Sequence, residues 1–466
     1  MNSTRKLAQS LGLGYVIVVV IGNIIGSGVY KKIAPMAAEL HSSGWVLIAW
    51  IVGGLITLFG ALSNAEVAGM LADTGGDFVY YKKIYNRFFA FIYGWSLFAV
   101  IQTAAISSLA YVFAQSFNNI LDLPVIFGSL SQFSIAGVFF PFEGFTVKLT
   151  AIILILLLTL VNIKGIKTGA GVSKLILILV FSGLFLIIAF GLGSTHSHPF
   201  QSFNFTSDSQ APVTISTFFT AMLASFWAYQ GWASVGFIGG EVREAKHNIP
   251  KGIVAGVFMV IAIYLLVNVP YLSLLSIPQL EQIYQSGNQI AAIEAVRSFW
   301  GDNGALFISF LILVTTLGCT NATILASARP YYAMAHENLF FKSAGALNKA
   351  NTPANSLFYQ GIWASVLVLS GSFDQLTDMI IFAVFIFYGA TSLAVFILRR
   401  RMPDAPRPYK VWGYPIVPAI FILFCIVLVF NTIFTRPREA IIGLTLIFSG
   451  VPVYWFLNRK KSDPKE

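Results

Sequence analysis

The stretch GNIIGSGVY, from Gly22 to Tyr30, lies inside the first long apolar segment of the chain. Its Gly26-Ser27-Gly28 triplet is unfavourable at that depth, because a glycine costs about 1 kcal/mol relative to alanine in a helix interior. Lipid also cannot satisfy a backbone N–H or C=O group that a helix releases. We therefore predict that the helix is interrupted at the triplet, and that the released groups line a cavity or meet a ligand.

The composition predicts that the interrupted helix belongs to a membrane protein. Of 466 residues, 57% are hydrophobic and only 10% are charged, with a mean hydropathy of +0.77. A soluble protein of ordinary composition carries roughly 25% charged residues. About twelve apolar runs are long enough to span the hydrocarbon of a bilayer, which takes about 20 residues. We expect an all-α polytopic membrane protein with twelve transmembrane helices and no cleavable signal segment.

The net charge of +10 is distributed by membrane side, which argues against nucleic acid as a partner. Most Lys and Arg residues fall in alternate loops, notably in Lys82-Lys83, Arg399–Arg401 and Arg459–Lys461. Cytoplasmic loops carry such an excess of Lys and Arg in membrane proteins. The pattern therefore predicts a multi-pass protein of the cell (plasma) membrane, in contact with the lipid bilayer and with both termini in the cytoplasm.

A second interruption is predicted in FWAYQGWASVGFIGGE, from Phe226 to Glu241, where Gln230-Gly231 breaks an aromatic helix. The two breaks lie about five spans apart, and two interrupted segments at matching positions are typical of a five-plus-five inverted repeat. We expect one transmembrane transporter domain over residues 1–466. It divides into a first repeat at 11–193, a second repeat at 214–399 and two additional helices at 414–458.

The two breaks offer opposite charges to one ligand. The outer half of the first span begins near Ser27, and its first N–H groups carry partial positive charge that suits a carboxylate. The first half of the sixth span ends near Trp227 to Gln230, where unpaired carbonyl groups carry partial negative charge and suit an ammonium group. The ligand that fits both is the zwitterion of an α-amino acid, held by main-chain atoms.

The chain resembles the amino acid permeases of the APC superfamily, and among them the L-type amino acid transporter branch. The resemblance covers the whole length and rests on IGNIIGSGVY, SNAEVAGMLADTGGDFVYY, VSKLILIL, FWAYQGW followed by GGEVREAKHNIP, NATILASARPYYAMAHENLF and PDAPRPYKVWGYPIVP. It implies a LeuT-like fold with broken helices 1 and 6. It also implies the substrate contacts: the carboxylate at Gly26, Ser27 and Gly28, and the ammonium group at the carbonyls of Ile24, Trp227, Ala228 and Gln230.

Lys174, near the inner end of the fifth span, is the ionisable residue that bears most on coupling. A lysine near a helix end can simply extend its ammonium group to water. The resemblance implies instead that Lys174 occupies the region where sodium-coupled relatives bind sodium, close to Thr320 or Asn321. It thereby implies sodium-independent transport, and a titratable lysine leaves proton coupling open.

Three positions depart from the pattern of the family. Trp227 stands where the family usually has the phenylalanine of the outer aromatic gate, and Gln230 replaces the glycine that usually follows. Ala233 stands where close animal relatives have asparagine. We expect these three residues to decide which amino acid is selected.

Acidic residues are expected at the inner ends of spans and not in the cavity. The resemblance implies a structural or gating role for Glu66. Glu241, with Arg243 and Glu244, forms either a latch of the cytoplasmic gate or a solvated, charge-paired helix end. With no acid placed to pair with a cationic side chain, the expected substrates are neutral.

These features together predict sodium-independent transport or exchange of neutral L-amino acids by alternating access. The alternatives are a proton-coupled symporter of small amino acids or amines, and an amino acid sensor without transport. An enzyme is not expected, because the spans hold no nucleophile–base set or metal-ligand cluster; no cofactor and no metal are expected either. Cys319 and Cys425 both lie within apolar spans, so no disulfide-linked glycoprotein subunit is expected.

Overall fold

The computed structural model of the protein describes residues 11–71, 76–135, 139–165, 170–199, 203–206, 212–287 and 289–459. At positions 170–175, 177, 237–240, 458 and 459 it describes the backbone alone. Within these ranges the regular secondary structure is helical, apart from two isolated β-bridges, which join Leu11 to Val242 and Ile135 to Phe139.

The first half of the described chain contains helices α1 (Leu13–Ile24), α2 (Gly28–Lys31), α3 (Ile33–Leu40), α4 (Ser43–Leu71), α5 (Asp77–Ile84), α6 (Arg87–Ser96), the π-helix η1 (Leu97–Ile101), α7 (Gln102–Leu121), the 3-10 helix η2 (Gly128–Leu130), α8 (Phe145–Ile163) and α9 (Ala170–Gly193). The second half contains α10 (Ile215–Tyr229), the 3-10 helix η4 (Trp232–Glu241), α11 (Ala245–Leu274), α12 (Ile277–Ser286), α13 (Ala291–His336), the 3-10 helix η5 (Lys342–Gly345), α14 (Ala354–Ser370), α15 (Phe373–Arg401), α16 (Ile416–Thr435), α17 (Pro437–Phe448) and α18 (Gly450–Arg459).

Eight helical stretches in the described chain are long and apolar enough to cross a membrane. They are Ser43–Leu71, Arg87–Leu121, Phe145–Ile163, Ala245–Leu274, Ala291–His336, Phe373–Arg401, Ile416–Thr435 and Pro437–Leu457. The shorter apolar helices Leu13–Ile24 and Ile178–Gly193 accompany them. The prediction of an all-helical, multi-pass membrane protein is confirmed.

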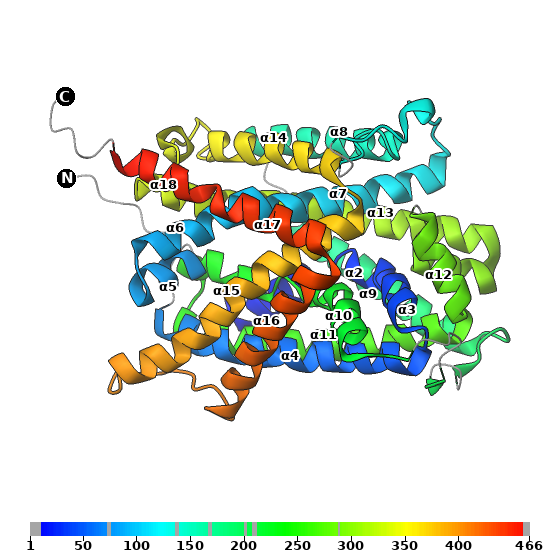
Figure 1. Cartoon of the computed structure of the whole chain (residues 1–466), viewed down its shortest axis with the longest axis horizontal. Helices are drawn as coiled ribbons and strands as arrows, with labels where there is room; N and C mark the ends of the chain where they lie inside the picture. Colours follow the sequence, from blue (N-terminus) through cyan, green and yellow to red (C-terminus); the bar gives the residue numbers. More distant parts are fainter. Residues whose placement is uncertain are drawn as a thin grey trace.

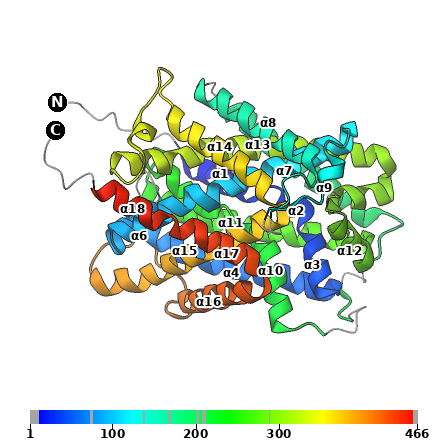
Figure 2. The ribbon, with the colours of Figure 1, turned by 45° about the horizontal axis from the view of Figure 1, so that its top comes forward.

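The long helices form an elongated bundle with two distinct ends (Figure 1). The end with α5 and α18 is called here the α18 end, and the opposite end, with α3 and α12, the α12 end. Helix α4 runs along one edge, and α8 and α14 pack side by side along the opposite edge. Helices α16 and α17 cover the outside of α15, in front of the bundle when it is turned (Figure 2). The basic run Arg399–Arg401 closes α15, and Arg401 donates to the carbonyl of Ile84 in α5 (2.8 Å), which places this run at the α18 end.

Close packing of glycine against valine holds α1 in the middle of the bundle. A β-carbon on Gly252 of α11 would lie 2.3 Å from a methyl group of Val16, and one on Gly256 would lie 2.6 Å from a methyl group of Val20. Small residues at these positions let two helices approach closely, which is the main source of helix association in lipid. Helix α11 in turn packs along α4, so α1 lies in a fixed groove.

A buried carboxylate ties α4 to the C-terminal end of α15. Glu66 is fully buried and receives two hydrogen bonds from the guanidinium group of Arg399, at 2.9 and 2.7 Å. The backbone N–H of Val411 donates to the same carboxylate (2.7 Å), and Arg407 approaches it at 3.5 Å. Glu66 therefore fastens a spanning helix to the loop that follows α15, in keeping with the structural role expected for it.

We predict that Glu66→Gln lowers the free energy of unfolding by about 3 kcal/mol, because removing one partner of a buried ion pair leaves the other charge uncompensated. Thermal unfolding in detergent, followed by intrinsic fluorescence, measures the change. The matched control is Glu337→Gln, which breaks the exposed Glu337–Lys82 pair (2.6 Å). Exposed pairs contribute at most about 1 kcal/mol. Equal losses in the two variants would contradict a fastening role for Glu66.

Candidate functional site

Helix α1 ends just before the predicted triplet, Gly26-Ser27-Gly28. Its last residue is Ile24, and Ile25 adopts extended torsions (φ −74°, ψ 95°). Helical structure resumes with α2 at Gly28, and no side chain caps that end of the helix. The first N–H groups of a helix have no acceptor within it, so those after Ser27 present partial positive charge to the break.

Helix α10 ends at the predicted second break. After Tyr229, Gln230 is extended (ψ 149°), and Gly231 has φ +122°, which L-residues other than glycine rarely adopt. A β-carbon at Gly231 would also lie 2.3 Å from the carbonyl oxygen of Asn23. Glycine is therefore required at position 231 both by its torsion angles and by its close contact with α1.

The two breaks touch each other. A β-carbon on Gly28 would lie only 2.5 Å from the Cα atom of Ala228, so α2 rests directly on the backbone of α10. Together with the contact between Gly231 and Asn23, this places the ends of four helical segments in one small volume.

Tyr264 of α11 connects the two breaks, and sequence reasoning missed it. Its hydroxyl group lies 3.1 Å from the carbonyl oxygen of Ile24 and 2.9 Å from that of Ala228, and the side chain is fully buried. One hydroxyl proton is thus placed between the last carbonyls of two broken helices. The sequence shows only a tyrosine within an apolar span. Whether its side chain points toward the breaks depends on the rotation of α11 about its own axis.

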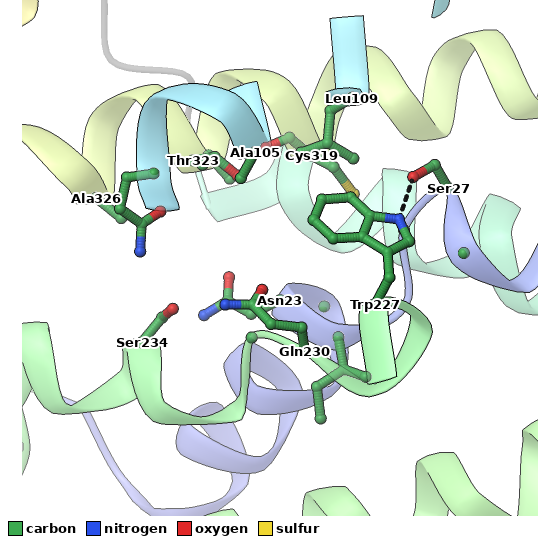
Figure 3. Close-up of a pocket in the computed structure, with 17 residues that line it drawn as sticks. Asn23, Ser27, Ala105, Leu109, Trp227, Gln230, Ser234, Cys319, Thr323 and Ala326 are labelled. Atoms are coloured by element: carbon green, nitrogen blue, oxygen red, sulfur yellow. Dashed lines mark hydrogen bonds between the residues drawn. The ribbon is translucent and has the colours of Figure 1, made fainter. Parts of the chain in front are cut away.

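A cavity with about 60 Å³ of space for water centres lies beside the breaks. A single water needs about 10–15 Å³ by the same measure, so the cavity suits a few waters or a small ligand. Figure 3 shows Trp227, Ser27, Leu109 and Cys319 at one end, and Ser234 and Ala326 at the other. The lining residues are Gly22, Asn23, Ile24, Gly26, Ser27, Gly28, Gln102, Ala105, Leu109, Trp227, Gln230, Gly231, Ser234, Cys319, Ala322, Thr323 and Ala326.

The cavity is closed on one side by Trp227. Its indole N–H donates to the hydroxyl oxygen of Ser27 at 3.2 Å, across the two broken helices (Figure 3). Phe373, at the start of α15, meets the indole ring edge-on with centroids 6.1 Å apart. The predicted aromatic gate is therefore in contact with the triplet itself.

Beyond Trp227, toward the α12 end, two buried lysines complete the closure. The ammonium group of Lys32, which follows α2, lies 2.6 Å from a carboxylate oxygen of Asp374 and 2.6 Å from the hydroxyl of Thr377. Lys31 donates to the amide oxygen of Gln115 at 2.8 Å. The chain segment after the first break is thereby joined to α15 and α7. Toward the α18 end, in contrast, the cavity continues along α13 from Cys319 to Ala326.

Other predicted site residues lie farther from the cavity. Ala228 contributes its backbone to the contact between the breaks, and Ala233 lies in η4 outside the cavity lining. Glu241, at the end of η4, pairs with Arg329 of α13 at 3.3 Å. Lys174 belongs to α9, but its side chain is outside the described part of the structure.

The arrangement can hold a small zwitterion. The uncapped N–H groups at the start of α2 attract an anionic group. The terminal carbonyls of α1 and α10 attract a cation, because the C-terminal end of a helix carries partial negative charge. Since Gly28 and Ala228 are in contact, these two regions of opposite polarity lie close together beside the cavity.

A multi-pass helical bundle with two interrupted helices around a central cavity is the architecture of a membrane transporter. A family model described as amino acid permease matches residues 11–457. The chain belongs to this amino acid permease family, whose members are transport proteins and not enzymes.

Characterised relatives match the chain along nearly its whole length. The serine/threonine exchanger SteT of Bacillus subtilis is 30% identical over 459 residues, covering 98% of each chain. The human b(0,+)-type amino acid transporter 1 is 26% identical, covering 97% of this chain and 88% of its own. The mouse large neutral amino acids transporter small subunit 2 is 28% identical, covering 96% and 81%. The chain is therefore similar to amino acid exchangers and transporters, as the sequence motifs predicted.

We predict that Lys32→Met destabilises the protein by about 3 kcal/mol, because it leaves Asp374 without its cation. Adding Asp374→Leu should recover most of that loss, since neither charge then remains. Lys31→Met is the matched control, because its hydrogen-bond partners are the neutral Gln115 side chain and the carbonyl of Gly287. Thermal unfolding of the wild type, the two single variants Lys32→Met and Asp374→Leu, their double variant and the Lys31→Met control measures the coupling. Strictly additive losses would show that Lys32 and Asp374 do not stabilise each other.

Proposed function

We propose that the protein carries out sodium-independent transport or exchange of neutral L-amino acids across the plasma membrane by alternating access. The observation that carries this proposal is the contact between the two breaks, with helix ends of opposite polarity beside one cavity. Membership of the amino acid permease family supports it. So do the printed activities of the relatives, which are exchangers and transporters of amino acids.

The substrate backbone is held by main-chain atoms of the breaks. Its carboxylate binds the N–H groups of Gly26, Ser27 and Gly28, and its ammonium group binds the carbonyls of Ile24, Trp227, Ala228 and Gln230. The hydroxyl of Tyr264 already lies against two of these carbonyls, so it sets their positions for the ammonium group. Selectivity then falls to the side chains around the cavity, among them Trp227, Gln230 and Ala233.

Neutral substrates fit the cavity. Of the 17 described residues that line it, none is an aspartate, glutamate, lysine, arginine or histidine. A cationic or anionic side chain would enter a region of low dielectric without a partner, which is costly. The volume favours small amino acids, in agreement with the name of the serine/threonine exchanger.

The proposed fold has twelve membrane spans, with an inverted repeat formed by residues 11–193 and 214–399, and two further helices at 414–458. Both termini lie in the cytoplasm, so the α18 end faces the cytoplasm. The basic run Arg399–Arg401 at that end supports this orientation. The cavity lining extends along α13 toward the α18 end, whereas the Trp227–Ser27 and Lys32–Asp374 contacts lie on its α12 side.

Alternating access then requires two closures that exchange. In the state described, Lys32–Asp374 and Trp227–Ser27 close the outer side. Glu241 and Arg329 lie only 3.3 Å apart at the inner side and connect η4 with α13, which suits a latch of the cytoplasmic gate. Lys174 lies on α9, which packs against α13. It takes the place of the sodium ion that sodium-coupled relatives bind. No disulfide-linked subunit takes part.

The test is uptake of labelled amino acids into proteoliposomes loaded with unlabelled amino acid, with and without sodium. We expect uptake of small neutral amino acids that depends on the internal substrate and is unaffected by sodium. Uptake driven by a pH gradient without internal substrate would establish the alternative, a proton symporter. Binding without any flux would establish an amino acid sensor. Failure of all amino acids to bind would overturn the proposal.

A second prediction concerns the contact between the breaks. Gly28→Ala should reduce amino acid affinity at least tenfold, because its β-carbon would meet the backbone of Ala228 at 2.5 Å and force the two helix ends apart. Stabilisation of the purified protein by added serine measures binding, since a ligand that binds the native state stabilises it by an amount that grows with the logarithm of its concentration relative to Kd. Gly14→Ala is the control, because nothing lies within 4 Å of its β-carbon. Unchanged stabilisation of Gly28→Ala by serine would contradict the carboxylate site.

A further inference from the structure

One turn of π-helix interrupts the 35-residue span Arg87–Leu121, and it lies directly before a cavity residue. The π-helix η1 covers Leu97–Ile101, and the N–H of Gln102 bonds to the carbonyl of Leu97, five residues back. Such single turns insert one extra residue into an α-helix and are frequent at functional sites. The residues that follow are rotated relative to an uninterrupted helix.

The π-helix is fixed by donors from three directions. The Leu97 carbonyl accepts a hydrogen bond from the hydroxyl of Tyr331 on α13 (3.2 Å), and the Ala99 carbonyl accepts one from the indole N–H of Trp363 on α14 (2.9 Å). The hydroxyl of Thr103 bonds to the Phe98 carbonyl at 2.7 Å. Backbone groups that a regular helix would satisfy internally are thus satisfied by side chains of two other helices. The position of the next residue, Gln102, is accordingly well defined.

Gln102 presents a buried amide to the cavity. It is 7% exposed and lines the cavity together with Ala105, which lies on the same face of α7. Its side-chain oxygen lies 3.1 Å from the hydroxyl oxygen of Ser327 on α13. The amide nitrogen has no hydrogen-bond partner in the described part of the chain. Because Gln102 lines the cavity, this nitrogen is available to pair with a ligand there.

A second amide–serine pair also joins α7 to α13, and comparison with it shows how the Gln102–Ser327 pair differs. Asn119 of α7 donates to the hydroxyl of Ser309 on α13 (2.7 Å), and Ser309 donates to the carbonyl of Ala305 in its own helix (2.7 Å). Ser327 likewise lies 2.7 Å from the carbonyl of Thr323, so its one proton serves either that carbonyl or Gln102. Whichever way the amide of Gln102 is turned, one polar end faces the cavity. Asn119 makes the same link between helices but lies outside the cavity lining.

We propose that Gln102 determines specificity by hydrogen bonding to a hydroxyl group on the substrate side chain. This rests on the proposed function, because the substrate backbone must lie at the breaks. A hydroxyl group both donates and accepts, so it pairs with either orientation of the amide. An apolar side chain of the same size leaves the amide unpaired and is rejected. The substrate class is thus small hydroxyl amino acids, and threonine is preferred over valine, which has the same shape.

The experiment compares threonine and valine as competitors of labelled alanine uptake in proteoliposomes. We expect the wild-type protein to prefer threonine by about tenfold, the effect of one hydrogen bond to a buried group. In Gln102→Met, which keeps the length of the side chain and removes the amide, the ratio should fall to about one, with valine competing as well as before or better. In the matched control Asn119→Leu the ratio should stay at the wild-type value.

Other outcomes separate the inference from the proposed function. An unchanged ratio in Gln102→Met, or a wild-type protein that accepts valine as readily as threonine, overturns the inference and leaves amino acid transport standing. Absence of any amino acid uptake or binding by the wild-type protein overturns both. If Gln102→Met does not fold, Ser327→Ala gives a second measurement: it removes the partner that orients the amide and should lower the ratio about threefold. An unchanged ratio in that variant would count equally against the inference.

Discussion

A helix that breaks in the middle of a membrane must find partners for the backbone groups that it releases, and the rest of this structure depends on that requirement. Lipid offers no partners. Here the two breaks are pressed together through Gly28, Ala228, Gly231 and Asn23. The hydroxyl of Tyr264 accounts for part of what the ends of α1 and α10 expose. Of the residues at the first break, Gly26, Ser27 and Gly28 line the cavity. The backbone of the break is therefore part of the cavity wall.

The polar groups of the core are arranged unevenly along the bundle. On the α12 side of the breaks, the buried Lys32 pairs with the partly buried Asp374, and its ammonium group lies over the ring of Phe373, which contacts Trp227. On the α18 side, the cavity lining is neutral but contains amides and hydroxyls, such as Asn23, Ser234 and Thr323. An ion pair such as Lys32–Asp374 holds two helices together specifically and can break and form again. Neutral polar groups, in contrast, allow a small solute to pass. The difference between the two sides is what a protein with two alternating closures requires.

The sequence predicted the features that depend on local backbone preference. Glycines mark both breaks, because this effect acts within a few residues, whereas the gate role of Trp227 stays a prediction. It did not predict Tyr264, because the direction of that side chain depends on how α11 packs against α1 and α4. The π-helix before Gln102 leaves no sign in the apolar pattern, since its residues Leu97–Ile101 are all apolar and have no periodicity to disturb. The pairing of Lys32 with Asp374 joins residues 342 positions apart, a distance over which one sequence gives no information. The part of Ala233 in selectivity stays a prediction.

The contact of Gly28 with Ala228 has a consequence for how this protein and its relatives diverge. The space between α2 and α10 holds one methyl group, and that methyl group belongs to position 228. A β-carbon at position 28 would meet the Cα atom of residue 228 itself, so removing the methyl group of Ala228 would not make room for it. Homologous sequences should therefore keep glycine at the position of Gly28, with alanine or glycine at that of Ala228. A glycine that never varies, matched with a small residue 200 positions away, would report the approach of two helices without any structure.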